Sequence, residues 1–494
     1  MTLRVLAAAS EAVPWVKTGG LADVIGALPA AVAPHDVAMT LMLPGYPAVM
    51  KALGQGPKRA RAVHRWMRLM GEPARLMAGS PDGKTQLLVL DAPAFFQRDG
   101  GPYAGPGGRD WPDNGRRFAA FGRAVADVAG GAVKGQRCDV LHAHDWQAGL
   151  APAYLRFAPP QPGLAGARAV GTVTTIHNMA FQGWFDAALF GELGLPAEAW
   201  TIGGVESYGG VGFLKSALQA SDRITTVSPT YAEEIREASF GMGLEGLIAS
   251  RGSDVRGILN GIDTAEWNPA TDTALAVRYS ARTLGKRIAN KRALEAEFGL
   301  ESDDGPLFVV ISRLTWQKGM DVLPEVLDHL VGLGGRLALL GSGDAAIEGA
   351  LRAGAARHPG RVALRMGYDE ALSHRMQAGG DAILVPSRFE PCGLTQLYGL
   401  AYGCIPVVTR TGGLADTVID ANFAARLGGV ATGIQFDTVD YPSLAGAITR
   451  TIRLHADKPA WAGLQRAGMA SDFSWTRSGG DYAALYREIA GGGA

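Results

Sequence analysis

The sequence has few cysteines, no excess of either charge and no long hydrophobic run. Its three cysteines (Cys138, Cys392 and Cys404) have no C-x-x-C spacing, which argues against a disulfide framework or a zinc–cysteine site and favours a reducing cytoplasm. The 47 basic residues balance the 47 acidic ones, so the overall charge indicates neither a nucleic acid nor a membrane partner. No apolar stretch could span a bilayer, and no signal peptide is evident. We therefore expect a cytoplasmic protein.

Several common catalytic motifs are also missing. The sequence contains no P-loop G-x-x-x-x-G-K-[ST], no G-x-S-x-G and no H-E-x-x-H, which argues against the corresponding nucleotidase, hydrolase and zinc-protease classes. The first apolar run is not followed by G-x-G-x-x-G, which argues against a dinucleotide-dependent oxidoreductase.

Ten short apolar runs recur along the chain, separated by helix-length segments. Runs of this kind are typical of parallel strands buried on both faces, and the series predicts two doubly wound α/β sheets, one in each half. The 494 residues suit two domains of about 200–250 residues each. The runs are 3–9, 87–91, 139–144, 170–176, 223–228, 307–312, 336–340, 362–366, 381–385 and 404–409.

A short internal repeat supports the two-domain interpretation. TGGLAD occurs at 18–23 and again at 411–416, each time before apolar residues at helical spacing. Helical periodicity fades at SRGSDVR (250–256), so we expect domains at 1–253 and 254–474.

The segment KTGGLADV opens a helix directly after the first predicted strand. Gly19 and Gly20 allow a ligand close to the backbone, the helix start presents free N–H groups, and Lys17 adds a positive charge. These features favour an anion. A plain strand-to-helix turn with a solvated lysine fits the glycines equally well.

Two segments of the second half carry charged residues after predicted strands. Arg313 and Lys318 lie in SRLTWQKG, at the carboxyl end of a strand, where two cations could clamp a diphosphate or simply be solvated. In EPCGLTQ, a helix start is expected near Leu394 and Thr395, which leaves Glu390 at the edge of the sheet. Glu390 could hold sugar hydroxyls or stabilise positive charge, and from this motif alone a helix-capping role is slightly favoured.

Polar residues also follow two strands of the first half, in HAHDWQAG and TTIHN. His142, His144, Asp145 and His177 are possible metal ligands, but alternate side chains of a strand point to opposite faces, which disfavours joint coordination. Hydrogen bonding to a polar ligand is the preferred interpretation, with His142 as a buried core residue the alternative.

Taken in order, KTGGLADV, HAHDWQAG, TTIHN, LNGID, SRLTWQKG and EPCGLTQ resemble the bacterial glycogen synthase and plant starch synthase family, from residue 3 to about residue 480. The resemblance implies the GT-B fold, two Rossmann-like domains facing a deep cleft, with a final helix at 475–491 returning to the N-terminal domain. It implies that the C-terminal domain holds the nucleotide sugar and that the N-terminal domain offers the acceptor surface. The implied partners are ADP-glucose and an α-1,4-glucan such as glycogen, with no cofactor and no metal.

The resemblance also implies roles for individual residues. The catalytic group comprises Glu390, His177, Arg313 and Lys318. The residues implied to bind the donor, ADP-glucose, are Lys17, Gly19, Gly20, Asp145, Asn260, Tyr368, Cys392, Gly393, Leu394 and Thr395, with Tyr368 stacking on the adenine.

The implied reaction is a retaining transfer of glucose to the non-reducing end of the glucan, with release of ADP. Retaining glycosidases use two close carboxylates, and the motifs offer Glu390 without a convincing partner. We therefore favour a front-face reaction in which the leaving phosphate helps to deprotonate the acceptor, rather than a double displacement. Two further hypotheses are a GT-B enzyme with UDP-glucose or another acceptor, and a catalytically silent glucan-binding protein.

Overall fold

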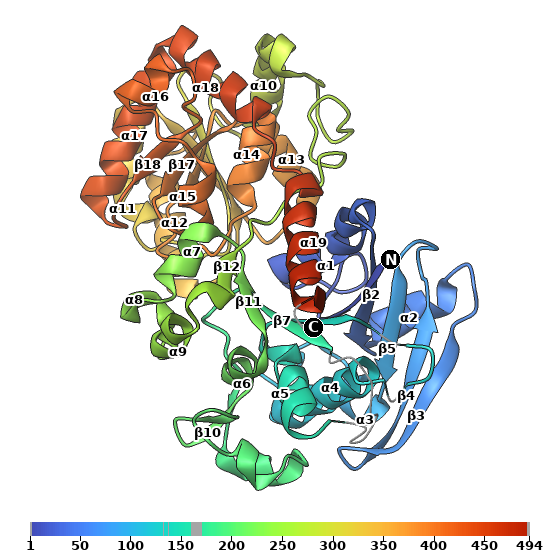
Figure 1. Ribbon diagram of the computed structural model, residues 1–494. Coiled ribbons are helices and arrows are strands. Elements are labelled where there is room, and N and C mark those ends of the chain that lie inside the picture. The colour runs from blue at the N-terminus through green and yellow to red at the C-terminus, as the bar shows by residue number, and fades with distance from the viewer. Residues whose placement is uncertain (1, 132, 137, 160–169, 492–494) are drawn as a thin grey trace. The chain divides into compact units, whose positions relative to one another are not determined.

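The computed structural model describes residues 2–131, 133–136, 138–159 and 170–491, and its strands and helices alternate along most of the chain (Figure 1). The chain forms two compact units. The first comprises Met1–Val227, Ala232–Gly261 and Trp475–Ala494, and the second comprises Ser228–Tyr231 and Ile262–Ser474. Each unit has its own sheet, mainly parallel in the first unit and wholly parallel in the second, flanked by helices, which confirms the predicted doubly wound α/β class.

The first unit is built on a nine-stranded sheet in the order β12-β11-β7-β6-β1-β2-β5-β4-β3. Strands β12 to β5 pair in parallel, whereas β4 pairs antiparallel with both β5 and β3. Both β6 and β7 are buried along their whole length, as expected of strands covered on two faces. The strands are β1 (Leu3–Ala8), β2 (Val37–Pro44), β3 (Arg61–Leu69), β4 (Glu72–Gly79), β5 (Gln86–Asp91), β6 (Val140–His144), β7 (Gly171–Ile176), β11 (Arg223–Thr226) and β12 (Val255–Gly257).

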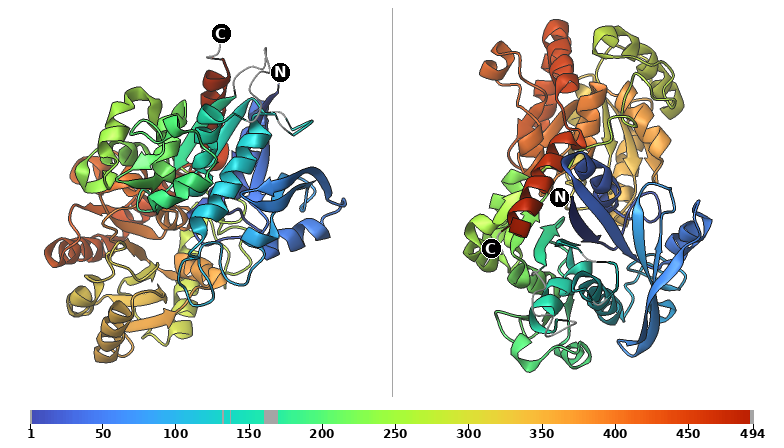
Figure 2. Two further views of the ribbon diagram at one scale, coloured as in Figure 1. Left: turned by 90° about the horizontal axis from the view of Figure 1, so that it is seen from below. Right: turned by 45° about the vertical axis from the view of Figure 1, so that its right-hand side comes forward.

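The last helix of the chain, α19 (Trp475–Gly491), belongs to the first unit and lies beside α1 (Gly20–Val32) (Figures 1 and 2). Close packing requires a glycine there, since a Cβ at Gly479 would lie 2.2 Å from the carbonyl oxygen of Ala31. The other helices of this unit are α2 (Pro47–Gln55), α3 (Pro93–Phe96), α4 (Asn114–Ala129), α5 (Leu150–Phe157), α6 (Phe213–Ala220), α8 (Ala238–Gly241) and α9 (Glu245–Ser250), with α7 (Pro229–Glu234) spanning the division between the units. A small antiparallel sheet contains β8 (Trp184–Phe185), β10 (Gly210–Gly212) and β9 (Glu206–Ser207).

The second unit has a six-stranded, wholly parallel sheet in the order β15-β14-β13-β16-β17-β18. Alternate residues of its central strand β13 enter different cores: Phe308 and Val310 join one cluster, and Leu307 and Val309 join the other. This explains the unbroken apolar run in the sequence, because successive side chains of a strand point to opposite faces. The strands are β13 (Leu307–Ile311), β14 (Arg336–Gly341), β15 (Val362–Met366), β16 (Ala382–Val385), β17 (Ile405–Thr409) and β18 (Ile434–Phe436).

Helices cover this second sheet on both faces. They are α10 (Arg287–Phe298), α11 (Leu323–Gly332), α12 (Ala345–Arg357), α13 (Glu370–Gly379), α14 (Thr395–Tyr402), α15 (Gly412–Thr417), α16 (Phe423–Leu427), α17 (Tyr441–Ala456) and α18 (Lys458–Ala470). Within the described ranges, no helix combines the length and the apolar character needed to cross a membrane.

All ten strands predicted from the apolar runs are present, within three residues at each end. Five strands of the two large sheets were missed: β2, β3, β4, β12 and β18. The antiparallel strands β3 and β4 extend at the edge of the first sheet (Figure 2). Many of their residues are exposed, so they lack the continuous apolar signature of the central strands.

Candidate active site

A buried ion pair lies after two neighbouring strands of the second unit. Lys318, in the loop after β13, places its ammonium against the Oε2 atom of Glu390, which follows β16. The hydroxyl of Ser387 donates to the same oxygen at 2.8 Å, and Glu390 is only 6% exposed. The sequence predicted these two residues from separate motifs, and the parallel pairing of β13 with β16 brings them together.

Each of these two loops carries an arginine, Arg388 after β16 and Arg313 after β13, and the two have different surroundings. The guanidinium of Arg388 donates to Asp321 at 2.6 and 2.8 Å and lies 4.5 Å over the ring of Trp316, so it is held by the protein itself. Arg313 is exposed, and its guanidinium has no ion-pair partner in the described ranges. Arg313 is therefore available to an anionic ligand.

Glu390 does not cap the following helix. The N-cap of α14 is Leu394, which has no side-chain capping hydrogen bond, and the helix begins at Thr395 as predicted. The helix-capping interpretation of Glu390 is therefore wrong. In the described chain, the amides of Thr395 and Gln396 have no protein acceptor, so the start of α14 presents two donors.

The second TGGLAD segment supports the turn that carries Glu390. A Cβ at Gly412 would lie 2.1 Å from the carbonyl oxygen of Glu390, and one at Gly413 would lie 2.1 Å from that of Cys392. The amide of Gly413 also donates to the carbonyl of Glu390 at 3.1 Å. These glycines are required because two backbones pack directly together. Gly393 has a positive φ of 71°, which completes the turn before Leu394.

Tyr368 follows β15, another strand of the same sheet, and is 70% exposed. Its hydroxyl donates to Oε2 of Glu370 at 3.1 Å. An exposed aromatic ring at the carboxyl end of a strand can stack on a planar ligand.

In the first unit, a buried carboxylate organises the turn before α1. Glu11 accepts hydrogen bonds from the amide and hydroxyl of Thr18, from the amide of Gly19 at 3.2 Å and from the hydroxyl of Tyr103. Glu11 is 2% exposed. Glu11 was not predicted from the sequence, since no motif surrounds it and its partner Tyr103 lies far along the chain, in the Gly- and Pro-rich segment before α4.

Glu11 occupies part of the anion site expected at this turn. The amides of Gly20 and Leu21 have no acceptor in the described ranges, and no atom lies within 4 Å of a Cβ built at Gly19 or Gly20. Lys17 is not a free cation, because its ammonium pairs with Asp23 at 2.8 Å. A ligand at this turn would therefore meet the amides of Gly20 and Leu21.

Asp145 has an unusual backbone and a buried side chain. It follows β6 with φ 54° and ψ −171°, a region that non-glycine residues rarely adopt. Its amide donates to the carbonyl of Thr175 at 3.0 Å, and its carboxylate accepts the amide of His177 at 2.7 Å. Burial, together with the nearby charge of Glu11, raises the pKa of Asp145 to about 7, although backbone hydrogen bonds act in the opposite direction.

Three histidines adjoin Asp145. Nδ1 of His144 lies 3.0 Å from Nε2 of His177, and His142 bonds to Tyr486 and Thr175 at 2.7 and 2.6 Å. Burial lowers the pKa of all three rings, that of His177 to about 3, so they are neutral near pH 7. The rings of His142 and His144 lie 3.8 Å apart, because residues two apart in a strand share a face. His142 and His144 therefore do not point to opposite faces, and the prediction from the sequence was wrong for this pair.

Asn260 lies beyond β12 in the first unit and is 6% exposed. Its side-chain oxygen is buried and accepts no hydrogen bond within the described ranges. A buried polar atom without a partner is costly, so a ligand donor is expected to complete it.

Ionisation of Asp145 gives a testable pH dependence of stability. The pKa of Asp145 is raised from 3.8 to about 7 in the folded protein. Between pH 4 and 7 the folded state therefore keeps a proton on Asp145 that the unfolded state has lost, and the free energy of unfolding falls as the pH rises. Asp145→Asn is therefore expected to reduce the fall in unfolding free energy between pH 5 and 7, by on the order of 2 kcal/mol. Urea denaturation at several pH values measures this. An unchanged pH slope in the variant would contradict the buried-acid assignment.

Two family models match the chain. Residues 4–250 match the family model described as "Starch synthase catalytic domain", and residues 292–460 match "Glycosyl transferases group 1". The chain is 69% identical to a glycogen synthase of Novosphingobium aromaticivorans over 99% of both chains. It is 56% identical to a glycogen synthase of Mesorhizobium japonicum over 98% of both.

Solved structures give the same result. The catalytic domain of starch synthase IV from Arabidopsis thaliana, bound to ADP and acarbose, superposes with a TM-score of 0.85 at 31% identity, covering 99% of this chain and 100% of that one. A sucrose-phosphate synthase from Thermosynechococcus elongatus shares the fold at 16% identity, with a TM-score of 0.59 and coverage of 99% and 100%. The two α/β units and these matches define a GT-B glycosyltransferase. Within that class, the chain belongs to the glycogen synthase family.

Proposed function

We propose that this member of the glycogen synthase family transfers glucose from ADP-glucose to the non-reducing end of an α-1,4-glucan with retention of configuration, and releases ADP. The observation that carries the proposal is the Lys318–Glu390 ion pair, with unpaired Arg313 in the same loop as Lys318 and the open start of α14 shortly after Glu390. A buried carboxylate beside cations and free amides suits a substrate that joins a sugar to a diphosphate. The ADP-bound starch synthase supports an adenine nucleotide.

In the second unit, we assign the diphosphate to Arg313, Lys318 and the amide of Thr395. Lys318 has three donor hydrogens, so it can keep its contact with Glu390 while also contacting a phosphate oxygen. The turn Cys392-Gly393-Leu394 and the carboxylate of Glu390 hold the glucose hydroxyls. Exposed Tyr368 stacks on the adenine.

In the first unit, we assign contacts with the transferred glucose to Asp145, His177 and Asn260. His177 is neutral near pH 7, so its ring donates or accepts a hydrogen bond without bringing a charge. The buried oxygen of Asn260 supplies an acceptor for a sugar hydroxyl. Gly19, Gly20 and Lys17 contact the diphosphate or its glucose, and Glu11 keeps their turn in shape.

The proposed chemistry needs no cofactor or metal. Negative charge grows on the ADP leaving group as the glycosidic bond breaks, and Arg313 and Lys318 stabilise that charge. A leaving phosphate oxygen then accepts the proton of the attacking glucan hydroxyl on the same face. Glu390 stabilises the positive charge that develops on the anomeric carbon.

Donor selection tests the proposal. ADP-glucose is expected to give a kcat/KM at least about tenfold above that of UDP-glucose, because the exposed ring of Tyr368 suits a purine better than a smaller pyrimidine. Incubation of the protein with glycogen and each donor, scored by nucleotide release, measures this. Tyr368→Ala should raise KM for ADP-glucose while changing kcat little. Equal turnover of both donors would favour the UDP-glucose alternative, and no turnover of either would favour a silent glucan-binding protein.

A further inference from the structure

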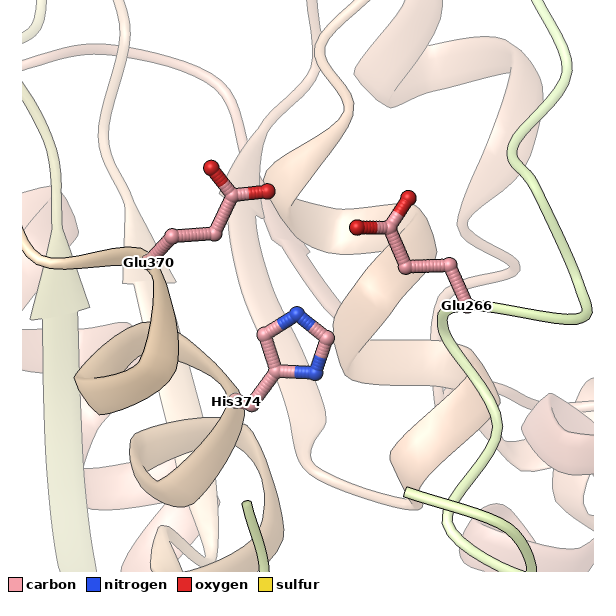
Figure 3. A group of neighbouring side chains, drawn as sticks. All are labelled: Glu266, Glu370 and His374. Atoms are coloured by element: carbon pink, nitrogen blue, oxygen red, sulfur yellow. The ribbon is translucent and has the colours of Figure 1, made fainter. Parts of the chain in front are cut away.

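A second group of side chains in the second unit lies outside the proposed glucose and diphosphate contacts. Glu266, Glu370 and His374 each offer one ligand atom, and these three atoms lie within 4.8 Å of one another. Figure 3 shows the two carboxylates on either side of the imidazole, with the outer ring nitrogen, Nε2, directed toward the space between them. Glu370 and His374 are four residues apart on α13, which places them on the same face of that helix.

The orientation of His374 is fixed by the protein. Its Nδ1 lies 2.7 Å from Oδ2 of Asp272, and the hydroxyl of Tyr402 donates to that oxygen at 2.6 Å. The ring also stacks on Trp267, with centroids 3.8 Å apart and an interplanar angle of 16°. A carboxylate bound at Nδ1 favours a proton there and leaves a lone pair on Nε2, as in histidines that ligate metals.

The Nε2 atom of His374 has no hydrogen-bond partner in the described part of the chain. His374 is 7% exposed. The two glutamates are exposed. Glu370 is itself oriented by the hydroxyl of Tyr368, which holds one carboxylate oxygen at 3.1 Å.

We propose that Glu266, Glu370 and His374 form a binding site for a divalent transition-metal ion of the Zn²⁺ type. An imidazole nitrogen with two carboxylates suits Zn²⁺ and its neighbours better than Mg²⁺, which prefers oxygen ligands. Ligand atoms at about 2.0–2.2 Å from one Zn²⁺ lie at most about 4.4 Å apart. The three atoms now lie within 4.8 Å of one another, so the glutamates must rotate toward the imidazole when the ion binds. The site is separate from the proposed reaction chemistry, which uses no metal.

Zinc binding to the purified full-length protein tests the inference. Metal-free protein is titrated with Zn²⁺ by calorimetry, and crystals grown with Zn²⁺ are measured at the zinc absorption edge. One zinc is expected, with an anomalous peak between the three side chains. The double variant Glu266→Gln/Glu370→Gln should bind Zn²⁺ at least about tenfold more weakly, because neutral amides replace both carboxylates.

Glu325→Gln is the matched control, since Glu325 is an exposed glutamate in the first turn of α11, as Glu370 is in that of α13. It should bind Zn²⁺ as the wild type does. His374→Gln should also weaken binding, but loss of the stacked ring could disturb folding, so circular dichroism accompanies that variant. Absence of zinc binding by the wild type, equal binding by the double variant, or an anomalous peak elsewhere would each overturn the proposal.

Discussion

Glu390→Gln is expected to lower kcat for glucosyl transfer by about a thousandfold, equivalent to about 4 kcal/mol of transition-state stabilisation. The substitution keeps the shape of the side chain but removes the negative charge proposed to stabilise the cationic anomeric carbon. Affinity for ADP should change little, because Arg313 and the amides of α14 remain. Steady-state kinetics with ADP-glucose and glycogen, together with calorimetric titration with ADP, measure the two effects.

Ser387→Ala provides the matched control for Glu390→Gln. It removes one hydrogen bond to the Oε2 atom of Glu390 but leaves both the carboxylate and its contact with Lys318. Its loss of kcat should stay within about tenfold, about 1.4 kcal/mol, because the carboxylate keeps both its charge and its contact with Lys318. Full activity of Glu390→Gln would remove Glu390 from the mechanism and leave its ion pair with a purely structural role.

Lys318→Ala is expected to lower kcat by about a hundredfold while raising KM for ADP-glucose less than about fivefold. The ammonium of Lys318 interacts most strongly with ADP in the transition state, because negative charge accumulates on the departing ADP. Its loss therefore destabilises the transition state more than the bound donor. Initial rates over a range of ADP-glucose concentrations separate the two constants. A variant whose only defect is a raised KM would contradict this role.

The pairing of Lys318 with Glu390 complicates a single substitution, because Lys318→Ala also leaves a buried carboxylate with Ser387 as its remaining side-chain partner. A double-mutant cycle with Glu390→Gln resolves this, since residues in direct contact do not act additively. Arg313→Ala gives an independent comparison. Arg313 has no ion-pair partner in the described chain, so its replacement should reduce activity without lowering the melting temperature.

Most strands at the centre of each sheet could be predicted because their signal is local, although β2, between β1 and β5, was missed. Buried parallel strands are apolar on both faces, and β13 shows why, with alternate residues in two cores. The edge strands β3 and β4 are amphipathic and partly exposed, so their pattern does not stand out from loop sequence. The helix start after Glu390 was also predictable, because Pro391 and Gly393 are strong local signals.

Some site residues could likewise be predicted from local motifs, and others could not. Arg313, Lys318 and Glu390 lie in compact motifs after strands, and the resemblance to the family named them. Glu11 could not be found, because its partners Thr18 and Tyr103 are brought to it by folding. The proposed zinc ligands also combine a loop residue, Glu266, with Glu370 and His374 on α13, more than a hundred residues later. No spacing in the sequence relates them.

The sequence by itself determined the two α/β sheets, the positions of most buried strands and the family, since these follow from local apolar runs and short motifs. The tertiary structure alone decided which charged groups meet. It paired Lys318 with Glu390, left Arg313 unpaired and placed Glu11 under the first glycine turn. It also gave Asp145 its raised pKa. The physical reason is that charge pairing and burial depend on distances between segments that only the folded chain brings together.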